Sequence, residues 1–164
     1  MNIPEFGIKR ENEVEVSGGC AIIFDPATKK YAVGKQENGR LRLFSGGVDK
    51  SEDIEKGVLR EVAEESGLHD FLHVEKIGEA YTHYYNSLKN SNRVGYATCF
   101  LMVLRSADLL PLKLEAHEKF TLDWATAKEM LQDWESRNEN KDNDHWIYFF
   151  KKAVEKLNGL EYGI

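Results

Sequence analysis

Residues 52–66 place the tightest limits on the fold, because they have the pattern of an amphipathic helix that also carries clustered glutamates. Ser51 is a candidate N-cap before this segment, and Gly67 stands where helices commonly stop. On a helical wheel the glutamates share an arc about 100° wide. They are Glu61, Glu64 and Glu65. Glu65 also falls inside the edge of the apolar arc, so the sequence predicts a carboxylate at the border of the core.

Three carboxylates at the spacings i, i+3 and i+4 lie side by side on one helix face, where they repel one another. Near a core edge they also lose hydration, so such a cluster either takes up protons or binds cations. Hard divalent cations prefer carboxylate and carbonyl oxygens, which makes Mg²⁺ the natural partner and Mn²⁺ an alternative. A solvent-exposed helix face is the simpler explanation of a run of charges, and only the neighbouring residues can distinguish it from a metal-binding cluster.

The neighbouring residues complete a long spaced pattern, G-x5-E-x7-R-E-x-x-E-E-x-G. Its fixed positions are Gly46, Glu52, Arg60, Glu61, Glu64, Glu65 and Gly67. A pattern with this many fixed positions is far harder to meet by chance than a lone glycine motif. Residues 46–68 resemble the Nudix box, the signature of Nudix hydrolases, which cleave nucleoside diphosphates linked to another moiety.

The resemblance assigns a role to each matching position. It implies that the metal ligands are Glu61, Glu64, Glu65 and the backbone carbonyl of Ser45. It also implies a supporting ion pair between Arg60 and Glu52, in which the guanidinium can hold the carboxylate through two parallel hydrogen bonds. A simple exposed pairing of Arg60 with Glu64, four residues on, is the ordinary alternative.

The box departs from the family pattern without losing a side-chain ligand. Phe44 and Ser45 stand where the family often has Pro-Gly, and Ser51 stands where it often has Gly. The first departure affects the loop, because serine tolerates positive φ less well than glycine. We therefore expect an active enzyme.

Family members often recruit a further glutamate from a loop late in the chain. Glu118 is the favoured candidate, followed by Glu115, although an ordinary exposed loop position explains either residue as well. His117 between them is a candidate proton shuttle, or simply a surface residue. The catalytic base stays open among Glu61, Glu64 and Glu118, with Arg60 as part of the catalytic machinery.

Strand patterns precede and follow the acidic helix. They cover residues 13–24, 30–35, 41–44, 73–81, 94–104 and 120–124, and helical spacing covers residues 126–135 and 144–158. This order favours an α/β sandwich with a mixed β-sheet, which matches the α/β/α sandwich that the Nudix resemblance implies. We expect residues 1–164 to form a single Nudix hydrolase domain.

Cationic and aromatic residues near the box are candidate substrate contacts. The cations are Lys35, Arg40 and Arg42, which would reach the mouth of the box if residues 30–44 form a hairpin. Solvated strand ends are the ordinary explanation for them. Tyr81 or Tyr84 could stack on a nucleobase, a contact worth about 1–3 kcal/mol, although core packing or a surface hairpin explains this aromatic stretch equally well.

Composition limits the partners and the compartment. With 22 Lys and Arg against 28 Asp and Glu, the net charge is −6, which argues against duplex nucleic acid as a partner. Cys20 and Cys99 lie in apolar runs and are expected to be buried, reduced thiols. Neither a signal-peptide core nor a membrane-spanning run is visible, so we expect a cytoplasmic protein with no membrane partner.

These observations predict metal-dependent hydrolysis of a diphosphate (pyrophosphate) bond in a nucleoside diphosphate linked to another moiety. A small-molecule nucleotide would be the substrate. The alternative is a non-catalytic nucleotide-binding or sensor module on a Nudix fold. Loss of acidic ligands would indicate such reuse, and here they are intact. The sequence leaves open the particular nucleotide, the bond that is cut and whether the chain forms a homodimer.

Overall fold

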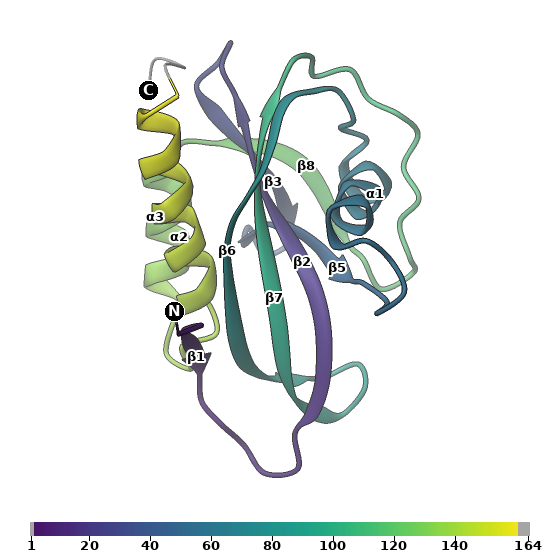
Figure 1. The fold of residues 1–164 in the computed structure, drawn as a ribbon, viewed down its shortest axis with the longest axis vertical. Coiled ribbons are helices and arrows are strands. Elements are labelled where there is room, and N and C mark those ends of the chain that lie inside the picture. The colour runs from purple at the N-terminus through teal and green to yellow at the C-terminus, as the bar shows by residue number, and fades with distance from the viewer. Residues whose placement is uncertain (1, 161–164) are drawn as a thin grey trace.

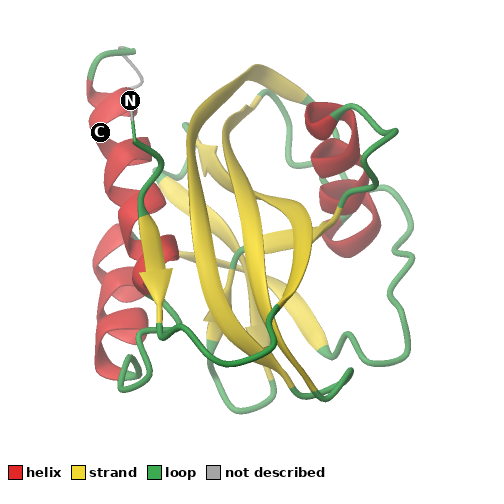
Figure 2. Ribbon diagram, turned by 60° about the horizontal axis from the view of Figure 1, so that its bottom comes forward, coloured by secondary structure: helices red, strands yellow, loops and turns green. Residues whose placement is uncertain are grey.

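A mixed β-sheet lies between two helical layers in the computed structural model, which describes residues 2–160 (Figure 1). Helix α1 (Ile54–Ser66) covers one side of the sheet. Helices α2 (Ala127–Ser136) and α3 (Asp144–Asn158) cover the other side, as Figure 2 shows from a second direction. This arrangement confirms the predicted α/β sandwich.

The sheet combines parallel and antiparallel pairs. Its strands are β1 (Glu5–Gly7), β2 (Val14–Asp25), β3 (Lys30–Gln36), β4 (Leu41–Arg42), β5 (Phe44–Gly47), β6 (Phe71–Asn86), β7 (Ser91–Leu104) and β8 (Phe120–Ala125). The main path is β1-β6-β7-β2-β3-β4, with β5 paired to β2 and β8 paired to β3. Strand β7 runs parallel to β2, and β1 runs parallel to β6. Residues 48–53, the box loop, connect β5 to the acidic helix, so this loop begins at the sheet.

Strand β2 is buried on both faces, which explains its unbroken apolar run. Ile22 packs into the hydrophobic cluster formed with α2 and α3, whereas Ile23 packs into the cluster formed with α1. Successive side chains of a strand point to opposite faces, so one strand supplies both cores. Burial of Val58 and Val62 against the second core holds α1 in place.

Two successive glycines of β2, Gly18 and Gly19, allow α1 and β5 to approach this strand closely. A Cβ on Gly19 would lie 2.3 Å from Cγ2 of Val58, and one on Gly18 would lie 2.6 Å from the carbonyl oxygen of Gly46. Real Cβ atoms do not approach other atoms this closely, so glycine is required where helix α1 and strand β5 contact β2.

The predicted start of the acidic helix was wrong by two residues. Asp53, not Ser51, is the N-cap, and its carboxylate accepts a hydrogen bond from the Lys56 N–H at 3.0 Å. A carboxylate is a strong cap and also interacts favourably with the helix dipole. Glu52 therefore lies outside the helix. The predicted end is confirmed, because Gly67 has φ +82° and donates its N–H to the Ala63 carbonyl at 2.9 Å.

The β6–β7 hairpin is longer than predicted, and β1 was not predicted. Residues 81–86 continue β6 and pair with residues 91–96 of β7. Strand β1 is only three residues long, and its partner is distant in sequence. Buried His83 of β6 secures it, with Nε2 3.1 Å from Oε2 of Glu5 and Nδ1 2.8 Å from Oε2 of Glu13. Burial lowers the pKa of His83, but the contacts with Glu13 and Glu5 outweigh this and raise it overall.

The cysteines match the sequence expectation. Cys20 and Cys99 are both buried, both carry free thiols, and they pair in register between β2 and β7. None of the helices within residues 2–160 is both long and apolar enough to cross a bilayer.

Candidate active site

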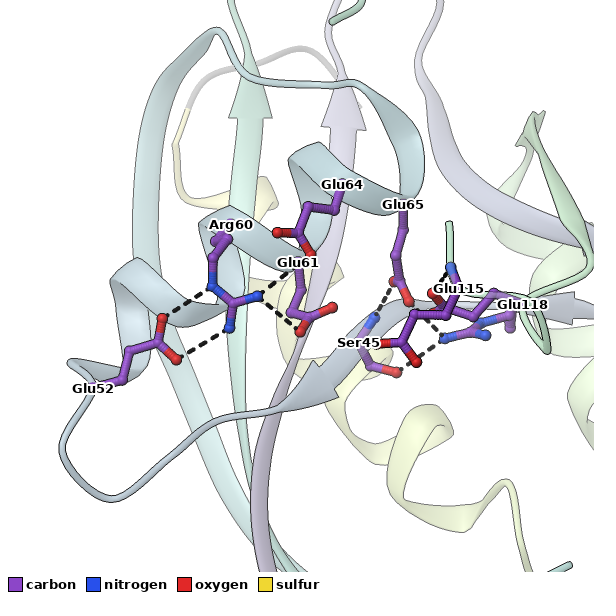
Figure 3. A network of polar contacts seen from close by, with 9 residues as sticks. Ser45, Glu52, Arg60, Glu61, Glu64, Glu65, Glu115 and Glu118 are labelled. Carbon is purple, nitrogen blue, oxygen red and sulfur yellow. Dashed lines mark hydrogen bonds and ion pairs between the residues drawn. The ribbon is translucent and has the colours of Figure 1, made fainter. Parts of the chain in front are cut away.

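Arg60 ties the box loop to helix α1. Its Nε donates to Oε2 of Glu52 at 3.0 Å and its Nη2 to Oε1 at 3.1 Å, which is the two-bond geometry predicted for this pair. The same guanidinium donates through Nη1 to Glu61 at 3.1 Å and to Glu64 at 3.4 Å (Figure 3). Because the Arg60 side chain is 42% exposed, these contacts add little stability and mainly fix the directions of the carboxylates.

Glu61 lies directly under the first glycine of the box. A Cβ on Gly46 would lie 2.3 Å from Cδ of Glu61, so only glycine leaves room for this carboxylate. Burial raises the pKa of Glu61, and the neighbouring Arg60 opposes the rise. Gly46 and Arg60 thus place the partly desolvated carboxylate of Glu61 beside strand β5.

Glu65 is the most deeply buried acidic residue of the cluster, with 2% of its surface exposed. Its Oε1 accepts a hydrogen bond from the Ser45 N–H at 3.0 Å, while its Oε2 has no hydrogen-bond partner. Nη2 of Arg42 stands 3.5 Å from that oxygen. Burial raises the pKa of Glu65 to about 9, and the adjacent Glu118 carboxylate adds to the rise. The helical wheel predicted this position at the core border, and the structure confirms it.

Glu118 comes from the loop between β7 and β8 and lies beside Glu65, opposite helix α1 (Figure 3). Its Oε1 accepts a hydrogen bond from the Glu115 N–H at 2.9 Å. The contact with Glu65 lowers the pKa of Glu118. Two adjacent carboxyls whose pKa values move apart share a single proton at neutral pH.

The donor set fits a hard divalent cation. An unpartnered, buried carboxylate oxygen is costly, and a cation beside it would offset that cost. The adjacent Glu118 carboxyl also offers oxygen, the donor that Mg²⁺ prefers. Within residues 2–160, no three acidic, histidine or cysteine side chains already converge in a metal-binding geometry. Glu61 and Glu64 contact Arg60 instead.

Two adjoining hollows lie beside the acidic cluster, and glutamates of the cluster line the first of them. One, of about 650 Å³, is lined by Arg42, Ser45, Glu61, Tyr84, Glu115 and Glu118, among others. The other, of about 590 Å³, shares Ser45 and Tyr84 with the first. It extends to Arg93, Tyr96, His145 and Trp146. The site therefore has a charged end beside the box and an aromatic end between the sheet and the start of α3.

The NUDIX domain family model matches residues 17–147, which is most of the chain. The chain belongs to the Nudix family. Because the box also keeps each of its charged side chains, this Nudix protein is a pyrophosphohydrolase of the Nudix type. A comparison with curated proteins found no match.

Solved structures share the fold at low sequence identity. The NUDIX domain of Shewanella oneidensis NrtR, complexed with ADP ribose, has a TM-score of 0.63 at 15% identity, covering 88% of this chain and 90% of that one. A MutT protein from Methanosarcina mazei has a TM-score of 0.61 at 17% identity, with 90% and 98% covered. A Caenorhabditis elegans Ap4A hydrolase has a TM-score of 0.59 at 16% identity, with 88% and 98% covered. At these identities the likeness shows the fold alone.

The predicted cationic contacts do not all reach the Nudix site. Arg42 lines the hollow beside Glu118. Lys35 instead pairs with Asp123, its Nζ 3.7 Å from Oδ2, and lines neither hollow of the site. Arg40 lines a third hollow, which shares Arg42 with the charged hollow and Trp146 with the other one.

Of the predicted aromatic contacts and loop residues, some line the hollows of the site and one does not. Tyr84 lines both hollows, whereas the Tyr81 ring packs on Tyr96 at 5.4 Å and lines neither of them. Glu115 and His117 line the charged hollow at its exposed rim, with 3.6 Å between His117 Nδ1 and Glu115 Oε2.

Sequence reasoning missed the contribution of helix α3. His145 and Trp146 line the aromatic end, where burial lowers the pKa of His145 to about 4. Trp146 belongs to the helix predicted over residues 144–158, and it packs on Trp134 at 5.6 Å while remaining half-buried. The usable signal was its place in the first turn of a helix, where side chains often remain accessible at one end.

Proposed function

We propose that this protein hydrolyses a diphosphate bond in a nucleoside diphosphate linked to another moiety, and that the reaction depends on Mg²⁺, with Mn²⁺ as an alternative. One observation carries the proposal: the buried Glu65 carboxyl has an unpartnered oxygen and lies beside Glu118, which lines a hollow of about 650 Å³. Such a group is costly unless a cation or a proton neutralises it.

The residues that would hold the cation are those the box supplies and one from the opposite loop. They are Glu61, Glu64, Glu65, Glu118 and the carbonyl of Ser45. When bound, the cation supplies neutralisation of phosphate charge and activation of water. Arg60, held by Glu52, keeps two of these carboxylates oriented toward the box loop.

The hydrolytic step needs a base for the attacking water. The water oxygen forms a bond to one phosphorus of the bridge, the bond from that phosphorus to the bridging oxygen breaks, and the departing phosphate keeps the electron pair. A carboxylate accepts the proton of the water. The candidates are Glu61, Glu64 and Glu118. Glu61 and Glu118 both line the charged hollow in which the bridge would lie, so either carboxylate can face the attacking water.

The two ends of the site suit the two parts of a nucleotide. Arg42 lines the charged end, where the phosphates would lie. Tyr84 and Trp146 line the other end, where an aromatic ring can stack on a base. The ADP ribose bound by the NrtR domain and the Ap4A named for the worm hydrolase are both nucleoside diphosphate derivatives, which supports this substrate class.

We also propose that the chain works as one domain in the cytoplasm. Its two thiols are free and lie side by side in register between β2 and β7, an arrangement that supports a reducing compartment.

The test is a hydrolysis screen over dinucleoside polyphosphates, nucleotide sugars, ADP-ribose and nucleoside triphosphates, in Mg²⁺, in Mn²⁺ and in EDTA. Glu64→Gln is run beside the wild type. Glu55→Gln is the matched control, because Glu55 is an exposed glutamate of the same helix outside the box pattern. We expect cleavage only with a metal, by the wild type and the control, and a product pair that identifies the bond. Binding of a nucleotide without cleavage across the whole panel would instead establish the non-catalytic module.

A further inference from the structure

Arg42 has an unusual set of partners for a residue expected to hold phosphate. Its guanidinium carbon lies 4.3 Å from the centre of the Phe120 ring. Its Nη2 donates to Oγ of Ser45 at 3.3 Å, and its Nε donates to the Leu43 carbonyl at 3.2 Å. Both hydrogen bonds are long, and the side chain is 20% exposed, so the group is placed by stacking more than by tight hydrogen bonds.

The same guanidinium is the nearest positive charge to the buried carboxyl of Glu65. Its Nη2 lies 3.5 Å from Oε2 of Glu65, the oxygen that has no hydrogen-bond partner. At neutral pH the Glu65 and Glu118 carboxyls together carry one negative charge, and the guanidinium attracts that charge without a formed hydrogen bond to Glu65. Arg42 therefore acts as the counter-ion of the Glu65 and Glu118 carboxyls when no metal is bound.

Arg42 also faces the space where a substrate phosphate would lie. It lines the charged hollow together with Ser45, Glu61 and Glu118. A divalent cation held by these carboxylates would repel the guanidinium, and it would make the arginine's charge unnecessary at Glu65. Rotation of one long side chain then brings the guanidinium to a phosphate in the same hollow.

We propose that Arg42 is shared between Glu65 and the substrate: it pairs with Glu65 in the metal-free protein and is released to the substrate's diphosphate when a divalent cation occupies the acidic cluster. This inference rests on the proposed function for the identity of the cation and the ligand. It adds a coupling between the two binding events, because the contribution of Arg42 to nucleotide affinity depends on the metal.

The test compares the wild type with Arg42→Gln by calorimetric titration of α,β-methylene-ADP, a diphosphate nucleotide whose bridge cannot be hydrolysed. With Mg²⁺ present, we expect Arg42→Gln to weaken binding about tenfold or more, because a charge-assisted contact to phosphate is lost. In EDTA we expect the same substitution to change the affinity by less than about threefold, since Arg42 is then occupied by Glu65. Arg105→Gln, which removes an exposed arginine that pairs with Asp70 outside the site, is the charge-matched control.

A second measurement, Mn²⁺ binding without nucleotide, separates sharing from simple support of the metal site. We expect Arg42→Gln to bind Mn²⁺ at least as tightly as the wild type, because a competing positive charge has gone. The proposal would be overturned if Arg42→Gln weakened nucleotide affinity equally with and without metal, or if this variant lost Mn²⁺ binding. It would also be overturned if the wild type did not bind α,β-methylene-ADP. Probe binding with the expected pattern but no hydrolysis would refute the proposed activity and still support the coupling.

Thermal unfolding checks that the variants are folded. If Arg42→Gln does not fold, Arg42→Lys provides the same comparison. Lysine keeps the charge but not the planar fork, so we expect a smaller loss that is again confined to Mg²⁺. A lysine variant that loses the same affinity in EDTA as in Mg²⁺ would overturn the proposal.

Discussion

Replacing Glu65 with glutamine should make the metal-free protein more stable. Glu65 is almost fully buried, and a charge on its carboxyl would be stabilised only by the Ser45 N–H at 3.0 Å and by Arg42 at 3.5 Å. A glutamine of the same shape can still accept the hydrogen bond from the Ser45 N–H, and its amide can face Glu118 as a donor. The variant thus reproduces the protonated form of Glu65 at every pH.

The magnitude follows from the pKa of Glu65, which burial raises to about 9 in the folded protein from a usual value of 4.5. Between these two pH values the folded state holds a proton that the unfolded state has lost, so wild-type stability falls as the pH rises. At pH 7 the accumulated cost is about 3 kcal/mol, which the glutamine variant avoids. For a domain of this size that corresponds to a rise in Tm of about 6–12 °C.

The assay is thermal unfolding in EDTA at pH 4.5 and at pH 7.5. We expect the variant and the wild type to unfold at similar temperatures at the lower pH, and the variant to be more stable at the higher pH. Glu64→Gln is the control, since the Glu64 side chain is 33% exposed and should change stability little at either pH. A Glu65→Gln variant that is less stable than the wild type at pH 7.5, or whose advantage does not depend on pH, would refute the reasoning.

Three further predictions concern the supports of the site. Gly46→Ala should leave the free energy of unfolding within about 1 kcal/mol of the wild-type value, because the flexible Glu61 side chain can rotate away from the added methyl group. That rotation displaces the Glu61 carboxylate, so the metal-dependent rate should fall about 10–100-fold in a steady-state assay. Arg60→Lys should lower that rate to a similar degree, because lysine cannot hold Glu52 through two bonds. The free energy of unfolding should change by less than about 1 kcal/mol. An unchanged rate would show that Arg60 does not support catalysis. His83→Gln should lower Tm more at pH 6 than at pH 8.5. The pKa of His83 is raised in the folded protein, so its stabilising effect is complete below about pH 6.5 and is lost as the pH rises through that raised pKa. Equal losses of Tm at both pH values would contradict this.

Local patterns predicted the acidic helix well because its information lies within one segment. The wheel placed Glu65 at the core border, and the structure buries it. The pairing of Arg60 with Glu52 came from the resemblance and is present with two hydrogen bonds. The cap was assigned to Ser51 and not Asp53, since both residues are good caps and periodicity does not fix a helix start to within two positions.

Contacts between distant segments could not be predicted in the same way. Glu118 reaches Glu65 across 53 positions of sequence, and only the folded sheet brings the two carboxyls together. Trp146 shows the same limit, because helical spacing describes which face is apolar and not what lies at the end of the helix. Lys35 was a reasonable phosphate contact by position, but the pairing of β3 with β8 directs it to Asp123 instead.

The acidic cluster is tested most directly by the rate at which Glu65→Gln and the wild type cleave the preferred nucleotide, at equal Mg²⁺ and with both proteins shown to be folded. We expect a variant that is more stable than the wild type without metal and yet slower by at least about a hundredfold, because the buried carboxyl that destabilises the fold is the one that holds the cation. A variant that cleaves the nucleotide within about tenfold of the wild-type rate would contradict the assignment of the acidic cluster as the metal-binding catalytic centre.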